Sequence, residues 1–385
     1  MTAARYIMGD CIQVMRSMPA ESVDLVVTSP PFLGQRSYLA DDDPAKALEH
    51  GMAGSPLEFV HELLDMVEEA HRVLAPHGSL VIELGDSMSG SGGAGGDYYN
   101  ADGQRAGQPK PPGSARLARQ ATDQLGWPRA KSAALIPEML RMAMAYGEVP
   151  YSGRQVEQWI IRNVVRWCKP NPSVGDEGDK FRRATNDMLV AAKEHHRYWD
   201  KLGARVERNF DLVPLLDYWE IPTGSYKGAH FATFPPELVQ PLLDSMVPRR
   251  VCTTCGDPSR PIIVPDPAYK AARGGGDLYA NGGKNDRGTG RNGGYASQGG
   301  NRKPGAMTAR YIQEGWTDCG HDTWRQGVVL DPYAGTGTTL MTAVGNGLDA
   351  IGIDLDHRNA DLAHERIGGL FLTIEHHKEN HDHDR

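Results

Sequence analysis

The sequence predicts an α/β fold with a mostly parallel sheet and long inserted loops. Short apolar runs typical of buried strands occur near both ends of the chain, at 23–27, 79–84, 327–330 and 350–354. An amphipathic helix over 55–74 separates the first two runs, and a helix in that place returns the chain to a parallel neighbouring strand. Two segments rich in Gly and polar residues, 87–130 and 266–306, interrupt the pattern and predict inserts.

The other elements follow from local patterns. Ser55 and Pro56 give the helix over 55–74 an N-cap and a first-turn proline. A proline pair at 235–236 opens a further helix in a similar way. The remaining helices are expected over 11–18, 134–146, 339–347 and 361–367. The remaining strands are expected over 5–10, 159–167 and 188–191.

Composition narrows the class of protein. A chain of 385 residues has room for one large domain with inserts or for two domains. No apolar run approaches the roughly 18 residues of a membrane span, and the N-terminus lacks the apolar core of a secretory signal. Five cysteines are too few and too scattered for a disulfide framework, so we expect a reducing, cytoplasmic location. The net charge is −8, yet positions 249–310 carry eleven Lys or Arg against four Asp or Glu, which suits either local contact with phosphates or a solvated loop.

One buried strand leads into Thr28, Ser29, Pro30, Pro31 and Phe32. Two consecutive prolines fix φ and remove two backbone donors, so the chain leaves the sheet as a stiff, extended loop. The Ser29 hydroxyl and the Pro30 carbonyl are then free hydrogen-bond acceptors, and Phe32 offers a flat face. Two acceptors beside an aromatic ring suit an exocyclic amino group on a flat heterocycle. An ordinary proline-rich turn is the alternative.

A glycine-rich turn follows the strand at 327–330. Glycines permit positive φ and close approach of a ligand, and the start of the next helix offers free amides. The turn lacks both the third glycine of a dinucleotide site and the lysine of a phosphate-binding loop, so it fits a nucleoside ligand without pyrophosphate. Asp354 ends the next strand, where a carboxylate can accept from ribose hydroxyls. The candidate ligand-binding residues of the turn are Asp331, Pro332, Tyr333, Ala334, Gly335, Gly337, Thr338 and Thr339; a tight turn without ligand is the alternative.

Two cysteine-containing pairs predict a metal site. Cys252 and Cys255 have the spacing of a zinc knuckle, and Cys319 with His321 offers a second pair. Tetrahedral Zn²⁺ takes four nitrogen or sulfur ligands, and these four residues form the natural set. We therefore predict structural zinc, with unpaired thiols on a loop as the alternative.

The motifs taken together resemble the permuted (β-class) DNA amino-methyltransferases. Ser-Pro-Pro-Phe comes first and the glycine turn last, in that family's order. Further similar landmarks lie between them, and the resemblance covers about residues 6–367. These landmarks are Gly9-Asp10-Cys11, the unit over 71–82, the segments 159–162 and 167–172, and His230 to Pro235.

The resemblance implies a Rossmann-like S-adenosylmethionine methyltransferase fold with circularly permuted motif order. It implies that Asp10, Cys11 and Thr28 bind the cofactor, with Asp10 beside its adenine. It also implies a base flipped out of double-stranded DNA onto Phe32. Within the family, serine at the position of Ser29 marks cytosine-N4 enzymes, so cytosine is favoured and adenine N6 stays open. The implied domains are a catalytic half (1–248) with target recognition at about 171–230, a zinc-knuckle insert (249–325), a cofactor half (326–370) and a disordered tail (371–385).

The sequence leaves two functions outside DNA amino-methylation as alternatives. A non-catalytic zinc-ribbon DNA-binding protein would have no reason to keep both Ser29–Phe32 and the glycine turn. A methyltransferase of RNA or of protein amides is a third reading. The family setting is restriction-modification in a bacterium or phage, and it leaves the recognition sequence, a cognate restriction endonuclease and the oligomeric state open.

Overall fold

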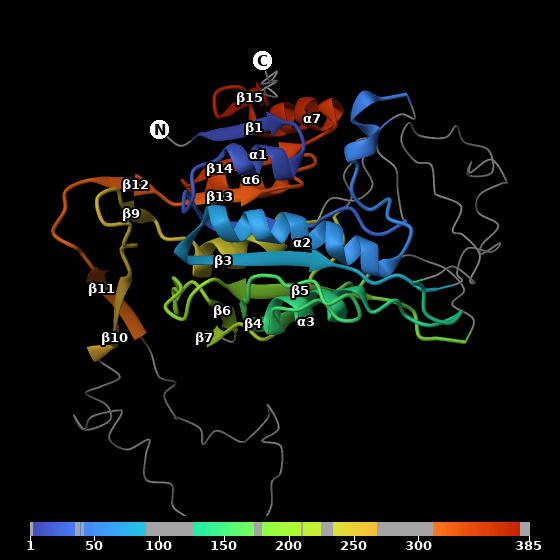
Figure 1. Ribbon diagram of the computed structural model, residues 1–385. Helices are drawn as coiled ribbons and strands as arrows, with labels where there is room; N and C mark the ends of the chain where they lie inside the picture. Colours follow the sequence, from blue (N-terminus) through green and yellow to red (C-terminus); the bar gives the residue numbers. More distant parts are fainter. Residues whose placement is uncertain are drawn as a thin grey trace, which may run out of the picture.

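A nine-stranded sheet forms the centre of the molecule (Figure 1). The computed structural model describes residues 3–34, 39, 42–89, 126–172, 179–208, 211–224, 234–267 and 311–377. The strand order is β15-β1-β14-β13-β2-β3-β5-β4-β8. Neighbouring strands are parallel except that β5 runs antiparallel to both β3 and β4. The predicted α/β fold with a mostly parallel sheet is confirmed.

The elements of the described chain have the following bounds. The strands of the large sheet are β1 (Ala4–Met8), β2 (Val23–Thr28), β3 (Leu74–Leu84), β4 (Ile160–Cys168), β5 (Thr185–Ala192), β8 (Tyr218–Glu220), β13 (Val328–Asp331), β14 (Asp349–Asp354) and β15 (Leu372–His376). Three two-stranded pairs are β6 (Arg205–Arg208) with β7 (Asp211–Pro214), β9 (Arg250–Cys252) with β12 (Trp324–Gln326), and β10 (Pro261–Pro265) with β11 (Tyr311–Trp316). The helices are α1 (Cys11–Ser17), the 3₁₀ helix η1 (Pro44–Leu48), α2 (Pro56–Val73), α3 (Ile136–Tyr146), α4 (Pro236–Met246), α6 (Thr338–Gly345) and α7 (His357–Ile367).

Helices cover the two faces of the sheet and create two cores. Alternate residues of a strand point to opposite faces, so Leu25 of β2 faces one core while Val26 faces the other. Helices α1, α2 and α3 pack on the Val26 side, and α4, α6 and α7 pack on the Leu25 side. The result is a three-layer arrangement.

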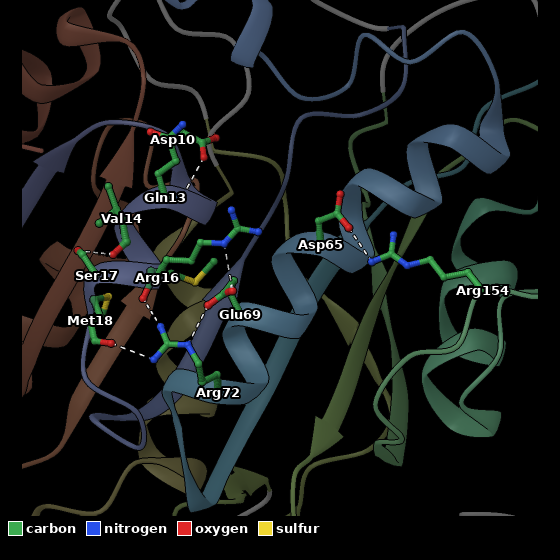
Figure 2. Close-up of polar contacts among 11 residues, drawn as sticks. Asp10, Gln13, Val14, Arg16, Ser17, Met18, Asp65, Glu69, Arg72 and Arg154 are labelled. Carbon is green, nitrogen blue, oxygen red and sulfur yellow. Dashed lines mark hydrogen bonds and ion pairs between the residues drawn. The ribbon is translucent and has the colours of Figure 1, made fainter. Parts of the chain in front are cut away.

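The helix α2 is fixed at both ends. Its capping box is complete, because Ser55 Oγ accepts from the Glu58 amide at 3.2 Å and the Glu58 carboxylate accepts from the Ser55 amide at 3.1 Å. At the other end Arg72 donates to the carbonyls of Met15 and Met18 and to Glu69, which joins α2 to the last turn of α1 (Figure 2). The Met15 carbonyl also accepts from the Met18 amide at the C-cap of α1, so Arg72 adds a second donor there and joins the two helix ends.

The two ends of the chain meet inside the sheet. Strand β1 lies between β15 and β14, and β13 lies between β14 and β2. Because parallel strands present their carboxyl ends at one edge, the ends of β2, β3, β13 and β14 lie together. This edge, called the active-site edge below, carries both the loop Ser29–Phe32 and the glycine-rich turn after β13.

The structure corrects the expected tail. Residues 372–376 form β15, an edge strand parallel to β1, and the Arg5 guanidinium binds Glu375 at 2.7 and 2.8 Å. The buried side chain of Leu372 packs in the core. The composition of residues 371–385 did not indicate this strand, because most of these residues are polar and several are His. Helix α7 also begins four residues earlier than expected, with Asp356 as its N-cap. Residues 378–385 and most of the inserts 87–130 and 266–306 lie outside the described residues.

Candidate active site

The loop Ser29–Phe32, called the catalytic loop below for its predicted role, leaves the sheet where β2 ends. All six residues of β2 are buried, and Ser29 follows at the active-site edge. The Ser29 hydroxyl donates a 2.6 Å hydrogen bond to Glu83 Oε2 on the neighbouring strand β3. The Asn186 side-chain amide from β5 donates to Glu83 Oε1. Both carboxylate oxygens of Glu83 are therefore held by the site.

Burial raises the pKa of Glu83, while hydrogen bonds from Ser29 and Asn186 and the charge of Lys169 oppose the shift. Because the Ser29 hydrogen is directed at Glu83, the lone pairs of Ser29 Oγ remain available to accept from a substrate amino group. Sequence reasoning identified Ser29 but missed Glu83 and Asn186. The available signal was a single carboxylate in the otherwise apolar run 79–84.

Close backbone packing positions the ring of Phe32. A Cβ added to Gly85 would lie 2.9 Å from Phe32 Cε2, so the ring rests directly on the backbone just after β3. Phe32 is half-buried, which leaves part of the ring accessible for stacking. Gly51 packs equally closely on the loop, because a Cβ there would lie 3.1 Å from the Pro31 carbonyl oxygen.

Asp331 joins the catalytic loop to the glycine turn. Its carboxylate accepts from the hydroxyls of Thr28 at 2.7 Å and Thr339 at 2.6 Å, and from the Tyr333 amide at 3.1 Å. Burial raises the pKa of Asp331 to about 6, against the effect of these hydrogen bonds. Thr28 immediately precedes Ser29, so the buried Thr28–Asp331 hydrogen bond connects the Ser29 loop to the glycine turn.

The turn itself closes on Asp354. The Gly335 amide donates to Asp354 Oδ2 at 2.9 Å, and burial raises the pKa of Asp354 to about 6. Gly337 has φ of 76°, and a Cβ there would lie 3.0 Å from Ala363 Cβ, so both conformation and space require glycine. The predicted residues of the turn are all present between β13 and the first turn of α6: Pro332, Ala334, Thr338 and Thr339.

The N-terminal landmark lies beside this turn. Asp10 caps α1 by accepting from the Gln13 amide at 2.9 Å, and Cys11 is the buried first residue of the helix. Burial raises the pKa of the Cys11 thiol to about 12. His50 Nδ1 lies 2.5 Å from the Tyr333 hydroxyl, and burial lowers the pKa of His50. His50, which sequence reasoning missed, therefore links the segment after the catalytic loop to the turn.

Lys169 adds a cation near these groups. Its ammonium lies 4.3 Å from the centroid of the Trp167 ring, just beyond the end of β4. Burial lowers the pKa of Lys169, and the charge of Glu83 opposes the shift. Ionisable groups whose pKa values are perturbed by burial and by specific neighbours are common at functional sites.

The predicted metal ligands come together. One ligand atom from each of Cys252, Cys255, Cys319 and His321 lies within 4.8 Å of the others. Three thiols and one imidazole are a donor set that suits tetrahedral Zn²⁺. The Thr254 amide donates to Cys252 Sγ at 3.3 Å, a contact that favours the thiolate form. The residues present therefore fit zinc.

The four ligand residues and the strands β9 and β12 beside them, together called the knuckle below, lie away from the active-site edge. Strand β12 of the knuckle places Arg325 against Asp24, the second residue of β2, with contacts to both carboxylate oxygens. Asp24 also accepts from His77 at 2.8 Å and from the Val328 amide at 2.7 Å. Burial would raise the pKa of Asp24, but the contacts with His77 and Arg325 outweigh it and lower that pKa. The knuckle is thus anchored to the end of β2 opposite Ser29. Figure 1 shows β9 and β12 together at one side of the large sheet.

The chain is similar to known methyltransferases in sequence and in fold. The chain is 30% identical over 236 residues to the type II methyltransferase M.Cfr9I of Citrobacter freundii, covering 61% of this chain and 70% of that protein. It is 23% identical over 368 residues to M.SmaI of Serratia marcescens, covering 95% and 91%. The solved PvuII DNA methyltransferase, described as cytosine-N4-specific, matches with a TM-score of 0.50 and 12% identity, covering 97% of this chain and 95% of that chain.

The family model covers most of the chain. Its description is DNA methylase, and it matches residues 23–252 and 283–365. Those ranges contain the catalytic loop, Glu83, the glycine turn and Asp354. The chain therefore belongs to the N6_N4_Mtase family of DNA methylases.

Proposed function

We propose that the chain transfers a methyl group from S-adenosylmethionine to the N4 amino group of a cytosine flipped out of duplex DNA. The observation that carries this proposal is the Ser29–Glu83 hydrogen bond, next to the Thr28–Asp331 contact with the glycine turn. Ser29 Oγ, the proposed acceptor for the amino group, therefore belongs to the residue next to Thr28, which contacts the glycine turn through Asp331. The description of the family model, DNA methylase, supports DNA as the substrate. A cognate restriction endonuclease is part of the proposal as a further partner.

The glycine turn and its neighbours suit the cofactor. S-adenosylmethionine supplies an electrophilic methyl group on a sulfonium. Asp354 offers a carboxylate to the ribose, and Gly335, where a Cβ would meet nothing within 4 Å, allows close approach of the cofactor to the backbone. Asp10 and Cys11 lie at the start of α1 beside Tyr333 of the turn, which supports their proposed place next to the cofactor adenine.

The catalytic loop orients the nucleophile. The N4 amino group is conjugated with the ring and weakly nucleophilic, so positioning supplies much of the rate. Ser29 Oγ and the Pro30 carbonyl accept its two hydrogens, and Phe32 stacks on the ring. As the N–C bond forms, positive charge develops on N4, and the nearby Glu83 carboxylate stabilises it.

The amine must then lose one proton. That proton can pass to Ser29 Oγ while the Ser29 hydrogen moves along its 2.6 Å bond to Glu83. In the whole reaction one N–C bond forms while one C–S bond breaks and S-adenosylhomocysteine leaves. One N–H bond is broken, one O–H bond is exchanged at Ser29 and one O–H bond is formed at Glu83. A carboxylate whose pKa is raised by burial is better suited to accept this proton.

The target base is tested by product analysis. Purified protein is incubated with unmodified genomic DNA and labelled S-adenosylmethionine, and the DNA is digested to nucleosides for mass spectrometry. We expect N4-methylcytosine. N6-methyladenine would retain the family and the mechanism but overturn the choice of base, and absence of either product would overturn the proposal.

We also propose structural Zn²⁺ in the knuckle. The support is the convergence of four soft or borderline ligands on one point and the anchoring of β12 to Asp24. Because the knuckle sits at the end of β2 opposite Ser29, its proposed role is to stabilise the fold and not to take part in methyl transfer.

A further inference from the structure

Phe181 is the most exposed large apolar side chain in the part of the chain that the structure describes, at 99%. Single exposed apolar residues are common on protein surfaces, so exposure alone decides nothing. The position of Phe181 near the active-site edge is what suggests a function for this exposed side chain. It precedes β5, whose first residues lie at the active-site edge because β5 is antiparallel to β3.

Contacts place Phe181 close to the catalytic groups. Asn186, five residues further along the chain, donates to Glu83. Arg183 donates to the Asp86 carbonyl, and Asp86 lies three residues after Glu83. Because each extended residue spans at most about 3.6 Å, the Cα atom of Phe181 lies within about 7 Å of the Cα atom of Arg183, whose side chain reaches Asp86.

The segment that carries Phe181 is held on both sides. Before it, Asp179 forms a 2.8 Å ion pair with Lys131. After it, Arg183 binds Asp86, and the Ala184 carbonyl accepts from the Lys169 amide at 2.7 Å. Asp86 is itself fixed, because its carboxylate accepts from the amides at the start of α3. The backbone after Phe181 is therefore fixed, while the solvent-exposed Asp179–Lys131 pair adds only a weak contact before it.

The flanking charges suit nucleic acid. Phe181 lies between Lys180 and Arg182, and Arg183 follows. Cations of this kind neutralise phosphates without regard to sequence. An exposed aromatic ring offers a stacking surface for any base, and apolar side chains inserted between base steps are a known means of opening a duplex.

We propose that Phe181 inserts into the base stack of duplex DNA next to the target nucleotide and fills the space left when that base moves to Ser29. The inference rests on the proposed function, because the space that Phe181 would fill exists only when the target base is flipped out of the duplex. It assigns a DNA-contacting role to a residue outside the catalytic loop and the glycine turn.

The test combines binding with a direct report of stacking. Phe181→Ala should weaken binding to duplex DNA, measured by fluorescence anisotropy with S-adenosylhomocysteine present, by about tenfold, within the range known for lost base–aromatic stacking. Phe181→Trp should retain binding, and its added tryptophan fluorescence should be quenched by DNA. The matched controls are Tyr151→Ala and Tyr151→Trp, at an aromatic residue that is 95% exposed in the turn after α3, where neither effect is expected.

The outcomes separate this inference from the proposed function. The melting temperature and the affinity for S-adenosylmethionine should not change in either alanine variant, because both side chains are exposed. Normal DNA binding by Phe181→Ala without quenching in Phe181→Trp would overturn the wedge while leaving the methyltransferase proposal intact. Quenching and weakened binding in a protein that forms no methylated nucleoside would retain the wedge and reject the chemistry. Failure of the unmodified protein to bind duplex DNA would reject both.

Discussion

Ser29 of the catalytic loop and Glu83 of β3 share a 2.6 Å hydrogen bond in which the serine is the donor. Ser29 directly follows β2, and Glu83 lies in the adjacent parallel strand β3, which ends at the same edge of the sheet. The bond fixes the direction of the serine lone pairs, and Asn186 fixes the carboxylate from the other side. The acceptor that the substrate meets is therefore set by three strands and not by the loop alone.

Removal of either partner should lower turnover more than cofactor binding. For Ser29→Ala and Glu83→Gln we expect kcat to fall about a hundredfold, within the range for lost acid–base or preorganised electrostatic groups. The dissociation constant of S-adenosylmethionine should stay within about twofold, because neither residue lies in the glycine turn. Single-turnover kinetics and calorimetry measure the two quantities. Glu375→Gln, at an exposed ion pair on β15, is the control, and an equal loss of turnover and cofactor affinity in Ser29→Ala would contradict the assignment.

The raised pKa of Glu83 should appear in the pH dependence of kcat. Below this pKa Glu83 is protonated, and it can neither stabilise the developing charge nor accept the proton. Turnover should therefore fall as pH decreases, with a midpoint above the usual Glu value of about 4.3. Glu83→Gln should lack this limb in its residual activity. An acid limb of unchanged midpoint in Glu83→Gln would assign the titration to another group.

The sequence predicts the strands and helices of this site better than its contacts. The strand β2, the helix α2 and the turn after β13 follow from apolar periodicity, Ser55-Pro56 and the glycines, because those signals are local. Glu83 and His50 were missed because each acts through a partner more than 50 positions away, Ser29 and Tyr333. Only the pairing of β2 with β3 and of β2 with β13 brings such partners together.

The strand β15 and the position of the knuckle show the same limit. Leu372–His376 pairs with β1 across the whole length of the chain, so composition near the C-terminus could not predict it. The four knuckle ligands were predictable from residue type and spacing. Their position at the end of β2 opposite Ser29 depends on the contact of Arg325 with Asp24, which no local pattern indicates.

Gly85 should be required for the position of Phe32. A methyl group at this position would lie 2.9 Å from Phe32 Cε2, so the ring must move while the backbone is kept. We expect Gly85→Ala to lower kcat/KM for DNA about tenfold, with a melting temperature close to that of the unmodified protein. Gly153→Ala is a poor control because φ there is positive; Gly345→Ala, where a Cβ meets nothing within 4 Å, is suitable. Unchanged kcat/KM in Gly85→Ala would argue against stacking on Phe32.

Cofactor affinity should rise with pH near pH 6. Burial raises the pKa of Asp354 to about 6, and a ribose hydroxyl donates more strongly to the ionised carboxylate than to the acid. Binding should therefore favour the deprotonated form and release protons. Calorimetry in two buffers of different ionisation enthalpy should show tighter binding at pH 7 than at pH 5 and proton release near pH 6. Asp354→Asn should bind more weakly and flatten this dependence; an identical pH dependence in Asp354→Asn would place the titration elsewhere, for example at Asp331.

Zinc removal should destabilise the fold without altering the chemistry of the folded enzyme. Protein purified without added metal should contain about one zinc per chain, and Cys252→Ser should lose it. Since metal binding to a closed site contributes directly to folding free energy, the variant and chelated protein should melt several degrees lower. The anchor from Arg325 to Asp24 lies at the end of β2 opposite Ser29, so kcat per folded molecule should remain within about threefold. Cys168→Ser, outside the four-ligand cluster, should keep its metal; a metal-free unmodified protein, or unchanged metal in Cys252→Ser, would contradict the zinc site.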